Sequence, residues 1–318
     1  MTWTLPTACL MTIMRKTEEL GVTPSYCAWL PRELYRKILG FIPAANDLSK
    51  LCRVSRTFRD ETQPLLYHSF ELLYDDSGRI LAWCHTIDRC PRLAQMVQFL
   101  RLPYELSLSN TSSRRPKFHT LLACALRKTV NLRGISIFEL PEISGGVGTD
   151  RMCTLIPKIM IGCHFRLLAF SGRLSTNAIQ VDWWKFFREQ TEIRYWDPVP
   201  RIPGHGMSLP GDMFPQLTAI ALRQTEPTSN TNLLFHLGSR PIERLSLQWE
   251  MSKGNPLYVI GWFDGLTHNI THFNWEALGS TSSIGVTPLS IILALVKQLP
   301  KLRFLRFCSG EADSVCSH

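Results

Sequence analysis

The sequence predicts an α/β protein in which a short N-terminal helical module precedes an irregular solenoid of alternating helices and parallel strands. Residues 29–66 carry apolar side chains at helical spacing, with residues that start and stop helices beside them. From residue 67 onward, an apolar pattern typical of a strand with one buried side recurs about every 29 residues. Helix-like stretches separate these recurrences, which favours a repeat architecture. The expected parts are an extension (1–28), the helical module (29–66), the solenoid (67–309) and a tail (310–318).

Composition indicates a globular chain with a buried core. The 318 residues are 45% hydrophobic and 19% charged. No apolar run reaches the roughly 18 uncharged residues that a membrane span needs, so no membrane association is expected. Ten cysteines are scattered without a CxxC pair. This favours reduced thiols in a cytoplasmic or nuclear protein over a disulfide scaffold.

The helical module begins with one predicted helix whose apolar positions form a stripe. Pro31 suits the first turn, where its missing N–H costs nothing. Gly40 and Pro43 mark the end of the helix. The predicted stripe comprises Leu34, Ile38, Phe41 and Ile42, with Leu39 flanking it.

A second helix is expected from a cap at Asn46 or Asp47 to Pro64, which closes the module. Its apolar face comprises Leu48, Leu51, Cys52, Ser55 and Phe58. Two short helices cannot enclose a core, so the next domain or a partner must cover part of this surface. Periodicity alone leaves open a plain helical hairpin that caps the following domain.

The same residues carry a resemblance to a known family. The strings are Leu30-Pro31-x-Glu33-Leu34-x-x-x-Ile38-Leu39, then Asp47-Leu48-x-x-Leu51-x-x-Val54-Ser55-Arg56-x-Phe58-Arg59, then Pro64-Leu65-Leu66-Tyr67. Together they resemble an F-box of the fungal type. The resemblance implies docking onto the Skp-type adaptor of cullin-based ubiquitin ligases. It also implies contact or contact-shaping roles, without settling which side chains face the partner, for Leu30, Pro31, Leu34, Ile38, Leu39, Leu48, Val54 and Ser55.

Nine strand cores follow, each reading apolar-x-x-apolar-x-apolar. The fifth is irregular because polar Gln190 holds its first place. The pattern resembles the L-x-x-L-x-L core of leucine-rich repeats, which run 20–29 residues. The predicted cores are Tyr67/Phe70/Leu72, Val97/Leu100/Leu102, Leu132/Ile135/Ile137, Phe165/Leu168/Phe170, Gln190/Ile193/Tyr195, Leu217/Ile220/Leu222, Ile242/Leu245/Leu247, Ile270/Phe273/Trp275 and Leu302/Leu305/Phe307.

Six stretches between the cores have helical character, and the alternative fold is a doubly wound sheet. Strands of that fold usually read as continuous apolar runs. Here, the residue between the last two apolar positions of each core is often polar or small. The solenoid is therefore favoured. Loops are expected at 107–115, 140–150 and 198–211. Helices are expected at Ile80–Ile87, Lys117–Arg127, Met152–Ile161, Asp182–Gln190, Asn232–Leu237 and Pro288–Leu299.

The sequence offers no catalytic signature. It contains no GxSxG, HExxH or kinase motif, and Gly145-Gly146-Val147-Gly148 lacks the lysine of a phosphate loop. His268 and His272 have no third ligand close in sequence, so no metal or cofactor is expected. Instead, exposed strand positions are the candidate contacts to a protein target. They are Arg101, Arg194, Trp196, Arg223, Gln248, Glu276 and Arg306.

The expectation from these residues is a non-enzymatic adaptor. The F-box would dock a Skp-type adaptor, and the repeat domain would bind a target whose identity the sequence does not give. Two alternatives remain: a Skp-bound scaffold outside any ligase, or a basic repeat protein that binds nucleic acid. The net charge of +9 prompts the second. That alternative ranks low because the arginines are dispersed without interleaved aromatic residues.

Overall fold

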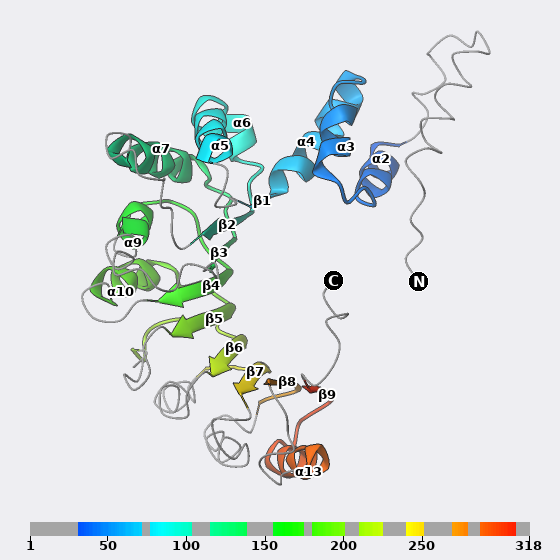
Figure 1. The fold of residues 1–318 in the computed structure, drawn as a ribbon, viewed down its shortest axis with the longest axis vertical. Helices are drawn as coiled ribbons and strands as arrows, with labels where there is room; N and C mark the ends of the chain where they lie inside the picture. The colour runs from blue at the N-terminus through cyan, green and yellow to red at the C-terminus, as the bar shows by residue number, and fades with distance from the viewer. Residues whose placement is uncertain are drawn as a thin grey trace, which may run out of the picture. The chain divides into compact units, whose positions relative to one another are not determined.

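Helices and parallel strands alternate along most of the chain in the computed structural model (Figure 1). The structure describes residues 31–71, 77–103, 115–138, 155–174, 180–200, 210–224, 240–250, 269–278 and 287–309. These fall into two compact units divided between Ser69 and Phe70. None of the described helices is long and apolar enough to cross a membrane. The predicted extension (1–28), Leu30, the tail (310–318), the helix at 232–237 and the loop at 140–150 lie outside the described residues.

Residues 31–69 of the first unit form three helices where the sequence predicted two. They are α2 (Arg32–Leu39), α3 (Ala45–Leu51) and α4 (Arg56–His68). The cap of α3 is Ala44, so the prediction of Asn46 or Asp47 as the cap is wrong. A turn at residues 52–54 ends α3, and Ser55 starts α4 by accepting a hydrogen bond from the Phe58 N–H at 3.1 Å.

Pro64 does not close the module, because α4 continues through it to His68. A proline inside a helix removes one backbone hydrogen bond and costs about 3 kcal/mol in a free helix. Tertiary packing outweighs that cost here, since α4 packs against both α2 and α3. Tyr67 therefore belongs to a helix, and the first strand begins only at Ser69.

The second unit is built on a nine-stranded sheet whose strands follow chain order without a reversal. Every pair from β2 to β9 is parallel, and strand order does not turn back as it does in a doubly wound sheet. The strands are β1 (Ser69–Glu71), β2 (Phe99–Pro103), β3 (Gly134–Phe138), β4 (Ala169–Leu174), β5 (Tyr195–Pro200), β6 (Ala219–Gln224), β7 (Arg244–Glu250), β8 (His272–Leu278) and β9 (Phe304–Ser309).

The helices between the strands confirm most of the periodic stretches in the sequence. They lie on one side of the sheet (Figure 1). In chain order they are α5 (Ser77–Arg89), α6 (Pro91–Ala94), α7 (Arg115–Lys128), α9 (Leu155–Met160), α10 (Gln180–Glu189) and α13 (Pro288–Gln298).

The strand register corrects two of the predicted cores. Phe170 lies opposite Ile135, and Trp196 lies opposite both Phe170 and Ile220. The fourth core is therefore Leu167/Phe170/Gly172, and the fifth is Ile193/Trp196/Pro198. Their third places hold glycine and proline instead of a bulky apolar residue, which hid the pattern. Gln190 consequently precedes its strand, and Pro198 lies in β5 rather than in a loop.

Gly172 is required where it stands because β4 approaches β3 closely at this point. A Cβ built on Gly172 would lie 2.8 Å from Ile137 Cβ and 2.9 Å from the Ile137 carbonyl oxygen. Its φ of 156° is also one that L-residues rarely adopt. The irregular third place of the fourth core thus has a steric cause.

Inside the second unit, the Arg240 side chain links the segment that leads into β7 to the segment that leads into β6. Its side chain is almost fully buried, with Nε donating to the Met213 carbonyl at 2.9 Å and Nη2 to the Pro210 carbonyl at 2.8 Å. Burial lowers the pKa of the guanidinium, while the nearby Asp212 carboxylate opposes that shift.

Replacing Arg240 by methionine should reduce the free energy of unfolding by about 3 kcal/mol, because two carbonyls lose a charged donor. Urea denaturation would measure the loss. The matched control is Arg244→Met on β7, whose side chain is exposed and should matter little. Equal losses of unfolding free energy in the two variants would contradict the stabilising role of the two Arg240 hydrogen bonds.

Burial also separates the cysteines by reactivity. It raises the pKa of the Cys84 thiol to about 12 and that of Cys163 to about 11, whereas Cys90 is exposed. Iodoacetamide at pH 8 should therefore modify Cys90 of the native protein and spare Cys84 and Cys163. Peptide mass spectrometry would check this, with urea-unfolded protein as the control in which all three react. Native labelling of Cys84 at the rate of Cys90 would contradict the burial.

Candidate functional site

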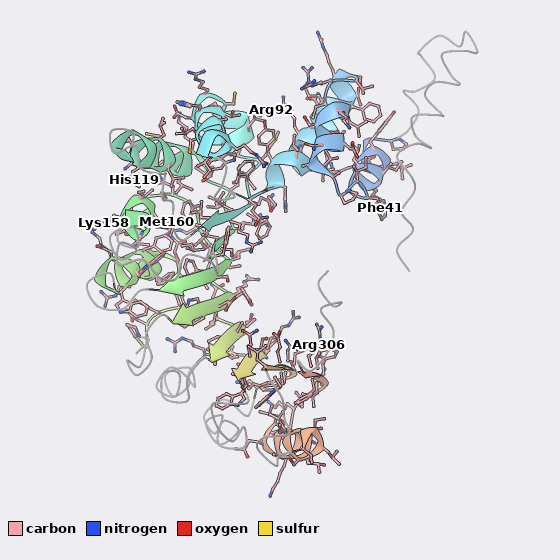
Figure 2. The ribbon with its side chains drawn as sticks, viewed as in Figure 1. Phe41, Arg92, His119, Lys158, Met160 and Arg306 are labelled. Carbon is pink, nitrogen blue, oxygen red and sulfur yellow. The ribbon has the colours of Figure 1, made fainter. Side chains whose placement is uncertain are left out.

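Helix α2 has two apolar faces, and only one of them is used inside the first unit. Leu39 is 2% exposed, and the Tyr35 ring packs edge-on to Phe58 with 5.5 Å between centroids. On the other face of α2, Leu34 is 42% exposed and Ile38 39%, and Phe41, in the turn that follows the helix, is 81% exposed. The sequence had placed Leu34, Ile38 and Phe41 on one stripe with Leu39 merely flanking it. We call Leu34, Ile38 and Phe41 the α2 outer stripe; Phe41 is labelled in Figure 2.

The other candidate contacts on the first unit divide in the same way. Leu48 is buried and packs inside the unit, whereas Pro31 and Val54 are exposed. Ser55 is exposed as well, but its hydroxyl is committed to capping α4. Phe41 was absent from the candidate contacts although it is the most exposed large apolar side chain of the described residues. Its helical spacing from Leu34 and Ile38 was the signal in the sequence that could have identified it as a candidate contact.

An ion pair fixes α2 against α4 beneath this surface. Arg36 donates to the same Glu61 carboxylate oxygen from Nε at 3.0 Å and from Nη2 at 2.8 Å. The Glu61 side chain is 5% exposed, so the pair is shielded from solvent on the carboxylate side. The α2 outer stripe is thereby held in one orientation on the unit.

The module is basic around its apolar surface. Lys50 pairs with Asp47 at 3.0 Å, and Arg59 Nε donates to the Cys52 carbonyl at 3.1 Å. Exposed Lys37 and Arg53 have no ion-pair partner within the described part of the chain. A partner with an apolar centre and an acidic rim would complement this surface.

The second candidate surface is the face of the sheet that points away from the helices, here called the inner face. A row of small or polar residues runs along it, with an arginine at each end. Ser171 donates to Asp197 at 2.8 Å, and Asn274 donates to Ser246 at 3.0 Å. The row is Arg101, Ser136, Ser171, Asp197, Ala221, Ser246, Asn274 and Arg306.

The structure does not gather the predicted target contacts into one site. Gln248 and Glu276 lie opposite each other on β7 and β8, and Arg306 is on the next strand. Arg101 lies on β2, seven strand spacings from β9, which is roughly 34 Å measured along the sheet at ~4.8 Å a spacing. Arg194 is exposed just before β5, and the side chain of Arg223 lies outside the described part of the structure.

Arg101 is already engaged at its end of the sheet. It pairs with Glu71 at 2.8 Å, and its guanidinium lies 4.4 Å from the centroid of the Phe138 ring. A partner that used Arg101 would compete with both contacts, which makes it a weaker candidate than exposed Glu276 and Arg306.

The prediction that Trp196 lies on the exposed face is wrong. Its side chain is fully buried and packs against Phe214 with 5.2 Å between ring centroids. The cause is the misplaced fifth core: the register assigns Trp196 to the inward middle position, where the sequence analysis had put Ile193.

The described residues contain no cluster of three or more side chains able to hold a metal ion. No protein-family model matches the chain, and no curated protein sequence matches it. The two surfaces themselves are therefore the basis for a functional interpretation.

Proposed function

We propose that this chain is the non-catalytic substrate-recognition subunit of a cullin-based ubiquitin ligase. Its first unit acts as an F-box that docks a Skp-type adaptor. Its second unit acts as a leucine-rich-repeat-like solenoid that binds a target protein. The cysteine usage supports a cytoplasmic or nuclear setting for this role.

The α2 outer stripe is the observation that carries the proposal. Leu34 and Ile38 on α2, and Phe41 in the turn that follows it, keep helical spacing and leave much of their apolar surface exposed. Keeping such a face in water forgoes about 25 cal/mol for each Å² of apolar surface that a partner would bury. Docking surfaces are where such exposure is usually found.

The sequential parallel sheet supports the receptor half of the proposal. Each repeat unit contributes one strand whose apolar core positions point inward, as in stacked repeats. The polar inner face is left available for a target. The two units together would then act by proximity, raising the effective concentration of target lysines near the ubiquitin-carrying partner.

Co-expression with a Skp-type adaptor and its cullin tests this proposal. Both partners should co-purify with the wild-type chain, and both should be lost from Leu34→Asp/Ile38→Asp. The matched control is Leu289→Asp, because Leu289 is 64% exposed on the second unit. Retention of the adaptor without the cullin would overturn the ligase role, and equal binding by the folded double variant would overturn the docking role.

A further inference from the structure

Within the described residues, the apolar core of the second unit is open at its C-terminal end. In the interior strands β2 to β8, the apolar core positions are at most 2% exposed, as in Leu100, Ile220 and Phe273. The corresponding positions of the last strand, Leu302, Leu305 and Phe307, are only half-buried. No strand of the described residues follows to cover them.

No described strand pairs with the outer edge of β9, so its backbone is also available there. The Phe304 N–H donates to the Thr271 carbonyl at 3.0 Å, so Phe304 faces β8 with its polar backbone groups. Because these groups alternate in direction along a strand, those of Leu305 and Phe307 point to the outer edge. An edge of this kind is a template for one further strand.

The segment that forms this end carries charges of one sign, while Glu276 on the neighbouring strand β8 lies opposite Cys308. Residues 287–309 contain Lys297, Lys301, Arg303 and Arg306 and no acidic residue. All four side chains are exposed. A second copy meeting this end edge to edge would face its own positive charge, whereas an acidic occupant would be attracted.

We propose that this open end, formed by Leu302, Leu305, Phe307 and the outer edge of β9, binds an extended acidic segment of a partner protein. The segment adds to β9 as a further strand. Its backbone groups pair with those of Leu305 and Phe307, while alternate apolar side chains cover the half-buried core positions. Its carboxylates lie near Lys301 and Arg303. This inference goes beyond the proposed docking of a Skp-type adaptor and does not depend on it.

Fluorescence polarisation with the full chain tests the inference. The probe is a labelled dodecapeptide in which valine alternates with glutamate. The wild type should bind it saturably, and Lys301→Glu/Arg303→Glu should weaken binding at least tenfold. A peptide with alternate valines replaced by proline should not bind, because proline lacks the N–H that strand addition requires.

Two variants serve as matched controls and should leave binding unchanged. Arg133→Glu/Arg244→Glu alters exposed arginines at the start of the interior strands β3 and β7. Leu293→Asp alters a side chain that is 62% exposed on α13, on the helix face opposite buried Ile291 and Leu295. Melting temperatures would verify that all variants fold.

Three outcomes would overturn the inference. The first is no saturable binding by the wild type, and the second is equal binding of the proline peptide. The third is a protein that is dimeric in solution and becomes monomeric in Lys301→Glu/Arg303→Glu, since a second copy would then be the occupant.

Discussion

Replacing Trp196 by alanine should lower the free energy of unfolding by about 3–5 kcal/mol. Trp196 is a residue of β5, and its fully buried side chain packs against the aromatic ring of Phe214. Its removal therefore leaves a cavity that the packed sheet cannot refill. Its strand neighbours Phe170 and Ile220 would lose packing at the same time. Chemical denaturation followed by circular dichroism would measure the loss.

Trp196→Phe is the matched control for this experiment. It keeps an aromatic ring in the core, and it removes an indole N–H for which the described residues provide no acceptor. The expected loss is below about 1.5 kcal/mol, as for shape-conserving core changes. An alanine variant as stable as the wild type would contradict the burial of Trp196 and would indicate that it lies on the exposed face.

Phe41→Asp should weaken binding of a Skp-type adaptor by about 100-fold, which corresponds to ~2.7 kcal/mol. The ring is 81% exposed in the unbound chain, so its replacement by a charged residue should cost little stability. In the complex, however, the carboxylate would have to be buried among apolar groups. Isothermal titration calorimetry would measure the two affinities.

Val130→Asp controls for the introduction of a charge at an exposed apolar position. Val130 is 44% exposed and belongs to the second unit, so adaptor binding should remain unchanged. A Phe41→Asp variant that binds like the wild type would exclude the α2 outer stripe from the interface. A Val130→Asp variant that binds as weakly as Phe41→Asp would attribute the loss to charge alone.

Helices with a strong apolar period were predictable from the sequence. The predicted ranges 80–87, 117–127, 182–190 and 288–299 correspond closely to α5, α7, α10 and α13. Two strand cores were misplaced in the prediction because their third places do not hold the bulky apolar residue of the repeat pattern. Gly172 meets a steric demand from β3 instead, and Pro198 occupies the same place in β5.

The candidate surfaces were less accessible to sequence reasoning. Spacing identified the apolar positions of α2 but not which of them face inward. That choice depends on contacts distant in sequence, namely Tyr35 with Phe58 and Arg36 with Glu61. The half-burial of Leu305 depends on its strand being the last of the sheet, which its own pattern does not reveal.

Titration of the full chain with a purified Skp-type adaptor tests the central claim most directly. A docking module of this kind predicts saturable one-to-one binding with a dissociation constant below about 1 µM, or more than ~8 kcal/mol of binding free energy. Calorimetry would report the stoichiometry and the affinity together. Absence of a binding isotherm, with a chain that unfolds cooperatively and is therefore folded at the start, would contradict the account.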